Sequence, residues 1–217
     1  MTKEILAVAK HQLATQGPSG VALRAVAREV GMVSSAIYRY FPSRDDLLTA
    51  LIVEAYEDLA DAIEEGERKQ KRADLRGRWI AAGRAVRQWG IDHPHQYGLI
   101  YGTPIPDYRA PEATIAPVIR ATGVMVAILA DGLATNALEP VPLPLSTAAK
   151  RSMSPVRHTY PDIPPDVLAS GLSAWIHLLG LVSFELFGHM NNVIESPAAF
   201  YDNELHRLAD LMLGVGS

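Results

Sequence analysis

The sequence contains no cysteine, and this absence excludes several kinds of protein. A disulfide scaffold, a thiolate metal site and a cysteine nucleophile all require this side chain. The absence also fits a reducing compartment. The first residues, which include Lys3 and Glu4, form no apolar signal-peptide core. We therefore expect a cytoplasmic protein.

Strand patterns and long apolar runs are also scarce. Helical periodicity dominates the chain, which predicts an all-α fold. The longest stretch without formal charge runs from Val167 to Phe184, and it includes His177, three serines and two glycines. We interpret it as a buried helix of a soluble protein rather than a membrane span, so no membrane partner is expected.

The usual short motifs of enzymes are missing. Gly171-Leu-Ser173-Ala-Trp175 begins like a nucleophile elbow but lacks its final glycine. No dinucleotide-binding, P-loop or His-Glu-x-x-His pattern occurs. His93 and His95 have no third metal ligand placed by the spacing. We therefore expect no enzyme, no cofactor and no metal site.

Charge is distributed unevenly along the chain. The formal net charge is −4, but residues 1–44 hold six basic and two acidic residues. Residues 45–67 carry nine acids and no base, whereas residues 68–87 carry eight bases and one acid. We interpret both runs as solvated helix faces. A small basic head on a larger acidic body is the expected arrangement.

The periodicity predicts about nine helices. Proline, glycine and capping residues set their expected bounds. Residues 139–165 contain seven prolines and are expected to form a long loop that covers part of the body. The expected helices are 2–16, 23–30, 34–40, 43–66, 71–92, 94–101, 111–138, 166–190 and 197–213.

Residues 23–42 have the pattern of a helix-turn-helix. Ala27 supplies the small residue that a steep helix crossing needs, and Gly31 supplies a residue tolerant of positive φ. Ser43 and Asp46 predict the start of the following helix. The inward positions are apolar: Leu23, Val26, Val30, Met32, Ile37 and Phe41. The outward positions, which suit a DNA groove, are Ser34, Ser35, Tyr38 and Arg39.

The stretch LRAVAREVGMVSSAIYRYFPSRDDLL resembles the DNA-binding head of the tetracycline-repressor (TetR) family. The body is similar to the branch with a WHG-type C-terminal domain, through Trp175, His177, Gly180 and Glu185 and through the stretch from Tyr101 to Tyr108. The resemblance implies a three-helix head over residues 1–48. It also implies a ligand-binding and dimerisation body over residues 49–217.

The resemblance implies DNA contacts at matching positions. Ala22 and Val33 depart from the family pattern, since both stand where serine or threonine usually caps a helix. Each lost cap costs about 0.5–2 kcal/mol and removes a possible phosphate donor. The expected DNA-binding residues are Arg24, Ser34, Ser35, Tyr38, Arg39, Tyr40 and Arg44.

The last two helices are the predicted dimer interface. Residues 172–187 hold ten large apolar side chains, so this helix must be buried on two sides. A core helix in a monomer is the alternative. Val215 extends the apolar stripe of the last helix. The predicted interface residues are Leu178, Phe187, Leu205, Leu208 and Met212.

A cluster of aromatic residues in the body predicts a cavity for a small, largely apolar effector. His177 and Glu185 lie two turns apart on one face, and they are expected to form a buried polar pair through a neighbouring helix or water, or to orient a ligand. For each aromatic residue, ordinary core packing is the alternative. The predicted ligand-binding residues are Trp79, Trp89, Tyr97, Tyr101, Met125, Trp175 and His177.

These observations favour a ligand-responsive transcriptional regulator, and a repressor is preferred over an activator. Such a regulator is expected to bind a near-palindromic operator on double-stranded DNA as a homodimer and to be released by a small molecule. An enzyme and a helical adaptor without a DNA role are the competing classes. A salt-dependent DNA-binding assay separates the first class from the other two.

Overall fold

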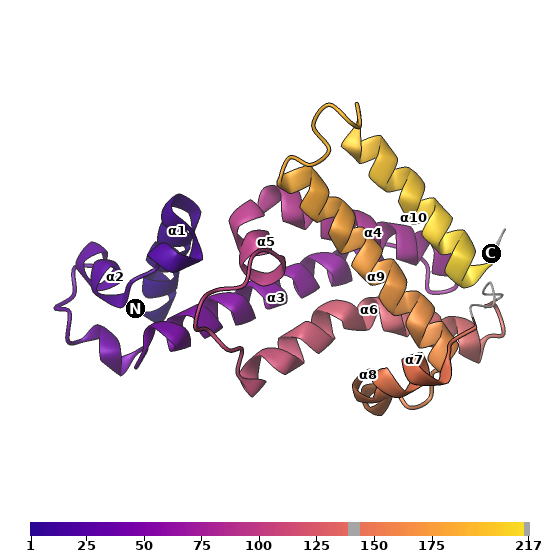
Figure 1. The fold of residues 1–217 in the computed structure, drawn as a ribbon, viewed down its shortest axis with the longest axis horizontal. Coiled ribbons are helices and arrows are strands. Elements are labelled where there is room, and N and C mark those ends of the chain that lie inside the picture. Colours follow the sequence, from indigo (N-terminus) through magenta and orange to yellow (C-terminus); the bar gives the residue numbers. More distant parts are fainter. Residues whose placement is uncertain (139–143, 215–217) are drawn as a thin grey trace. The chain divides into compact units, whose positions relative to one another are not determined.

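The computed structural model describes residues 1–138 and 144–214. These residues form ten α-helices and two 3₁₀ helices, with no strand among them. The all-α prediction is confirmed, although about nine helices were expected. Figure 1 shows the order of the elements along the chain. The elements are α1 (Thr2–Gly20), α2 (Leu23–Glu29), η1 (Ile37–Arg39), α3 (Arg44–Arg68), α4 (Leu75–Asp92), α5 (Pro94–Tyr101), η2 (Glu112–Thr114), α6 (Ile115–Ala134), α7 (Thr147–Ser152), α8 (Ser154–Thr159), α9 (Pro165–Leu186) and α10 (Pro197–Leu213).

The helices pack into two compact units. The first unit comprises Met1–Ala60 and Gly90–Ala121, and the second comprises Asp61–Trp89 and Thr122–Ser217. The first unit extends past the predicted head because Leu99 of α5 joins the same apolar core as Ile5, Val26 and Leu47. The resemblance implies a boundary after residue 48, between a DNA-binding head and a ligand-binding and dimerisation body. This boundary stays a prediction.

Local sequence signals set most of the helix ends in the first unit. Gly17 has a φ of +70° and interrupts α1 after Gln16, as the Gly-Pro pair predicts. Ser43 and Asp46 form a capping box at the start of α3. The Ser43 backbone N–H donates to Asp46 Oδ2 at 2.9 Å, and the Asp46 backbone N–H donates to Ser43 Oγ at 3.1 Å.

Arginines of α4 connect the helices of the second unit. Arg84 pairs with Asp202 of α10 at 2.6 Å, and Arg87 donates to both carboxylate oxygens of Glu185 in α9. The buried Arg78 pairs with Glu67 of α3 and with Asp131 of α6. The interpretation of residues 68–87 as a solvated face is therefore wrong for α4. Arginines of α4 form ion pairs with acidic residues on four other helices, and Arg76 pairs with Asp210 of α10.

The pKa values of these groups follow from the same contacts. Burial alone would lower the pKa of Arg78, but its hydrogen bonds with Asp131 and Glu67 raise that pKa above the usual value. The hydrogen bond from Arg84 lowers the pKa of Asp202. The ionised forms are therefore the stable ones in the folded chain.

α10 lies close against α4 at a glycine. A Cβ atom added to Gly83 would come within 2.2 Å of Leu205 Cδ2, so a larger residue there would require the Leu205 side chain to shift. The Tyr201 hydroxyl donates to the Gly83 carbonyl at 2.9 Å, and the Trp79 indole donates to the Leu205 carbonyl at 3.3 Å. α9 and α10 run antiparallel beside one another (Figure 1).

The predicted long loop over residues 139–165 is wrong in part, because it contains α7 and α8. Ser146 caps α7 by accepting from the Ala149 backbone N–H, and Pro155 stands in the first turn of α8, where its missing N–H costs nothing. Residues 139–143 of the predicted loop, and Val215 of the predicted apolar stripe, lie outside the described residues.

Two stretches, Glu112–Ala134 and Pro165–Leu186, are long and apolar enough to cross a membrane by length and composition. A core helix of a soluble protein passes the same test, so this property is weak evidence for a span. Within the chain, 33% of the first apolar window and 39% of the second are buried. Both helices thus retain apolar surface that their own chain does not cover.

Candidate functional site

The turn between α2 and η1 has the hydrogen bonds of a Schellman motif. The Met32 N–H donates to the Ala27 carbonyl at 2.8 Å, and the Gly31 N–H donates to the Arg28 carbonyl at 3.1 Å. Gly31 has a φ of +77°, as the sequence predicts. The glycine therefore reverses the chain tightly after α2 and sets the direction of the next segment.

The second helix of the motif is shorter than predicted. Residues 34–36 form a turn, and only Ile37–Arg39 form a 3₁₀ helix. The segment lacks a side-chain cap, and Pro42 restricts the backbone of Phe41, so an α-helical ladder has little length in which to form. Ile37 and Phe41 are buried and hold the segment against α1 and α2.

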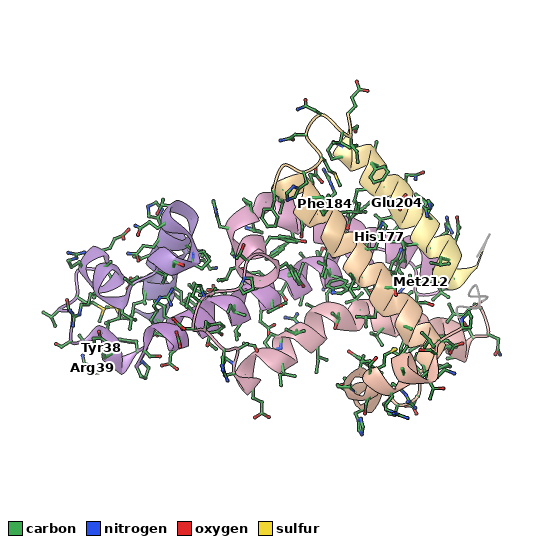
Figure 2. The ribbon with its side chains drawn as sticks, viewed as in Figure 1. Tyr38, Arg39, His177, Phe184, Glu204 and Met212 are labelled. Atoms are coloured by element: carbon green, nitrogen blue, oxygen red, sulfur yellow. The ribbon has the colours of Figure 1, made fainter. Side chains whose placement is uncertain are left out.

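The predicted DNA-contacting face is exposed. Tyr38 is 43% exposed and Tyr40 is 38% exposed, although both are large and partly apolar. Figure 2 labels Tyr38 and Arg39 beside one another on η1. All six of these predicted positions are exposed: Arg24, Ser34, Ser35, Tyr38, Arg39 and Tyr40.

Arg44 has a structural contact that the sequence did not indicate. Its Nε donates to the Val21 carbonyl at 3.0 Å, and an Nη atom donates to the Pro18 carbonyl at 2.8 Å. The guanidinium thus ties the first turn of α3 to the end of α1. Its predicted contact with a DNA phosphate stays a prediction.

Gln12 supplies a side-chain acceptor at the start of α2, where Ala22 has no capping side chain. Its side chain is 4% exposed, and its Oε1 accepts from the Ala22 backbone N–H at 3.4 Å. Its amide donates to Glu29 Oε2 at 3.3 Å. A polar residue at a core position of α1 was the one sequence signal for this role, and sequence analysis missed it.

Two of the predicted ligand-binding residues meet in an apolar cavity of about 90 Å³ in the second unit. Met125 of α6 and Trp175 of α9 both line it. The structure does not place the others there. Trp79 packs against α10, Trp89 is buried, and Tyr97 and Tyr101 lie in the first unit, where Tyr101 contacts Tyr56.

The aromatic cluster of the first unit has its own chemistry. The Tyr56 and Tyr101 rings meet edge to face with centroids 5.9 Å apart, and Tyr97 lies 5.1 Å from Tyr101. Burial raises the pKa of both Tyr56 and Tyr101 above the ordinary value. These phenols therefore stay neutral at physiological pH.

His177 and Glu185 do not pair with each other. His177 Nε2 lies 3.1 Å from Glu204 Oε2 on α10, while Glu185 binds Arg87. Glu204 is 3% exposed and also accepts from Arg207. Figure 2 shows His177 and Glu204 on the two adjacent helices α9 and α10. His177 therefore links these helices and does not line the cavity.

Most of the predicted interface residues belong to the core of the second unit. Leu178, Leu205, Leu208 and Met212 are at most 8% exposed, so their own chain covers them. Phe187 is the member of that set that is exposed. The exposed apolar side chains of α9 lie elsewhere, at Leu172, Ile176 and Phe184. The helical periodicity of α9 indicates apolar residues on two faces, but it does not indicate which of the two faces is exposed.

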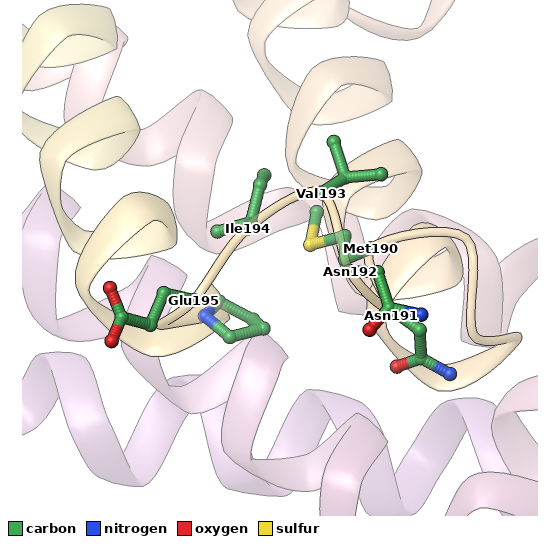
Figure 3. A pocket seen from close by; sticks show the side chains of 7 residues that line it. Met190, Asn191, Asn192, Val193, Ile194 and Glu195 are labelled. Carbon is green, nitrogen blue, oxygen red and sulfur yellow. The ribbon is translucent and has the colours of Figure 1, made fainter.

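The loop between α9 and α10 forms a separate open pocket of about 790 Å³. Figure 3 shows Met190 to Glu195 around it. All of its lining residues come from one connecting segment and Pro197, so no facing helices close over it. We assign it no role.

An exposed, basic helix-turn-helix head joined to a body of apolar helices defines a class, the helix-turn-helix transcriptional regulators. Comparison with protein families agrees with this class. Residues 5–51 match the model described as bacterial regulatory proteins of the tetR family. Residues 79–208 match the tetracyclin repressor-like C-terminal domain. The chain belongs to the TetR family of transcriptional regulators, and the family members it resembles are not enzymes.

Individual relatives support the assignment over nearly the whole chain. The HTH-type transcriptional regulators Rv1816 of Mycobacterium tuberculosis and Mb1846 of Mycobacterium bovis are each 33% identical, with 96% of this chain and 91% of the relative covered. The crystal structure of the regulatory protein SCO4313 is 33% identical with a TM-score of 0.77, over 95% of this chain and 94% of that one. A Rhodococcus sp. RHA1 protein of unknown function shares the fold at 21% identity and a TM-score of 0.72, over 98% and 93%.

Proposed function

We propose that this regulator is a ligand-responsive repressor that binds a near-palindromic operator as a two-fold dimer. A small, largely apolar effector releases it from DNA in the bacterial cytoplasm. The exposed outer face of residues 34–39 carries this proposal. It presents a phenol, a guanidinium and two hydroxyl groups on a head with an excess of four positive charges over residues 1–44.

The chemistry of this face suits DNA. Hydroxyl groups and a phenol donate to phosphate oxygens, and a guanidinium reads guanine in the major groove through two parallel hydrogen bonds. We assign phosphate contacts to Tyr38 and the serines and a base contact to Arg39. Arg24 and Tyr40 lie outside residues 34–39, and we assign to them contacts with the sugar-phosphate backbone of the DNA.

The exposed apolar stripe of α9 supports the dimer. Leu172, Ile176, Gly180 and Phe184 follow at steps of four, which places them along one side of the helix. Ile176 is 60% exposed and Phe184 is 55% exposed, which is unusual for such large apolar groups. A Cβ atom at Gly180 would meet nothing within 4 Å, so a second helix has room to approach. Phe187 continues the stripe.

The effector acts by shifting a conformational equilibrium. It must bind the conformer whose heads are misplaced for adjacent grooves more tightly than the DNA-bound conformer. α3 is the proposed lever, because residues up to Ala60 belong to the first unit and residues from Asp61 to the second. Allosteric couplings of this kind are typically about 1–3 kcal/mol.

A direct test uses the full chain and a DNA duplex that the chain itself selects from a random pool. We expect the selected sequence to be a near-palindrome with half-sites about 34–36 Å apart, one turn of DNA. Affinity should fall steeply with salt, because bound phosphates release counterions. Selection of no consensus sequence, together with a monomer in light scattering at micromolar concentration, would leave a helical adaptor as the better assignment.

A further inference from the structure

The large apolar side chains that are exposed in residues 1–60 gather in the helix-turn-helix. Val33, Tyr38 and Tyr40 all lie within residues 33–40, and the fourth, Met1, is at the chain end. Single exposed apolar residues are normal on a protein surface, but these three are not scattered. The tyrosines also carry a hydroxyl group, whereas the side chain of Val33 has no polar atom. Val33 is nevertheless 72% exposed, well above the 43% of Tyr38.

The backbone fixes Val33 at the N-terminal end of the second segment of the helix-turn-helix. It directly follows the Schellman turn, in which the Met32 N–H donates to the Ala27 carbonyl at 2.8 Å. Its own carbonyl accepts from the Ala36 N–H at 2.9 Å, which begins the turn that leads into η1. In helix-turn-helix proteins, the N-terminal residues of the second helix contact base edges in the major groove. Val33 therefore occupies a position at which a side chain meets the bases.

Neither capping nor packing explains a valine at this position. Its side chain has no oxygen to accept from a backbone N–H, and no side chain caps η1. Val30 and Met32 pack against the core of the first unit, whereas Val33 is exposed. Serine or threonine would cap the segment here and would interact better with water. The apolar side chain thus gains free energy when DNA covers it.

The major groove presents one apolar group on the base edges, the C5 methyl of thymine. Guanine, adenine and cytosine are distinguished there by hydrogen-bond donors and acceptors, and a valine side chain can pair with none of them. A valine that covered such a group would remove water from it and return no hydrogen bond, which is unfavourable. The side chain of Val33 is therefore suited to thymine.

We infer that Val33 recognises one thymine in each operator half-site through contact between its methyl groups and the C5 methyl of the base. The inference rests on the proposed operator binding and specifies one base of that operator. It adds a second specified base to the one assigned to Arg39. The contact is apolar, so it is independent of the charge of the head.

The test replaces the thymines of the selected duplex with deoxyuridine, one position at a time. Deoxyuridine keeps the pairing and the O4 acceptor of thymine and lacks only the C5 methyl. We expect one position in each half-site at which this change weakens binding of the wild-type full chain about four-fold, the value of one buried methyl group. In Val33→Ser, which removes both methyl groups, the same change should have no effect.

Two further variants serve as controls. Val33→Thr keeps one methyl group in nearly the same shape, and it should retain part of the preference for thymine. Val193→Ser removes the same groups from a loop position of the second unit that is 76% exposed, and it should behave like the wild type. Circular dichroism checks that each variant folds. If the effect of deoxyuridine at every position is the same in the wild type and in Val33→Ser, the inference is wrong.

Failure of this inference differs from failure of the proposed function. A selected consensus duplex that contains no thymine, or whose deoxyuridine effects do not depend on Val33, overturns the inference and leaves operator binding intact. A uniform loss of affinity in Val33→Ser over all duplexes would assign Val33 to the DNA backbone and also overturns it. Selection of no consensus sequence overturns both.

Discussion

At the scale of single residues, the head separates side chains that face outward from those that hold it together. Tyr38 and Arg39 are exposed, whereas Phe41, two residues further on, is buried. Arg44 belongs fully to neither group. Its side chain is half-buried, and its guanidinium donates to two backbone carbonyls of the first unit. Arg44 therefore has a structural role in the head, and its contact with a DNA phosphate stays a prediction.

Arg39→Ala tests base recognition. If the guanidinium reads one guanine, the variant should lose about 1–3 kcal/mol of discrimination at one operator position and little elsewhere. Binding to a set of duplexes with single substitutions measures this. Arg28→Ala removes the same charge from an exposed position of α2 and serves as the control. A uniform loss over all duplexes would instead assign Arg39 to phosphate.

Arg44→Ala and Arg44→Lys distinguish a phosphate contact from a structural one. Loss of the hydrogen bonds to Pro18 and Val21 should destabilise the first unit by about 1–3 kcal/mol in both variants, since lysine lacks the forked geometry. The number of counterions released on DNA binding should fall by roughly one in Arg44→Ala and stay the same in Arg44→Lys. Urea unfolding and salt titration measure the two effects. Unchanged stability in both variants would contradict the structural role.

At the scale of elements, caps and ion pairs determine how helices begin, end and meet. The capping box of Ser43 and Asp46 and the Schellman turn at Gly31 are local, and each was visible in the sequence. The arginines of α4 act over long sequence separations. Arg84 and Asp202 are 118 residues apart, and the sequence shows no sign of their pairing.

The lowered pKa of Asp202 predicts a pH dependence of stability. Because its folded-state pKa lies below the unfolded value, the pair stabilises the fold above that unfolded value. The contribution is lost as the pH falls through the folded-state pKa. The pair is partly exposed, so we expect no more than about 1 kcal/mol. Unfolding from pH 7 to pH 3 should show a shallower loss for Asp202→Asn than for the wild type, and identical slopes would contradict the assignment.

At the scale of the whole molecule, the apolar stripe of α9 is the surface that a second copy would cover. Ile176→Glu places a charge on that stripe at a residue that is 60% exposed, so the monomer should fold normally. The dimer and operator binding should be lost together. Light scattering and circular dichroism check assembly and folding. Val193→Glu, at an equally apolar loop position that is 76% exposed, is the control and should remain dimeric.

The coupling between effector and operator must be reciprocal. If a ligand weakens operator binding by a given factor, operator DNA must weaken the ligand by the same factor. A coupling of about 1–3 kcal/mol corresponds to about 5- to 150-fold. Calorimetric titration of ligand with and without the selected duplex measures it. A ligand that binds equally well in both cases would leave a constitutive DNA-binding protein.

Local signals in the sequence predict the all-α fold, the bounds of most helices, and the helix-turn-helix with its exposed positions. These follow from local periodicity, caps and turn residues, which act within a few residues along the chain. Tertiary structure alone decided which apolar face of α9 is covered, which acids pair with α4, and that His177 does not join Met125 and Trp175 at the cavity. Such contacts join residues far apart in the sequence. In addition, the identity of an apolar residue does not indicate whether its own chain or a partner covers it.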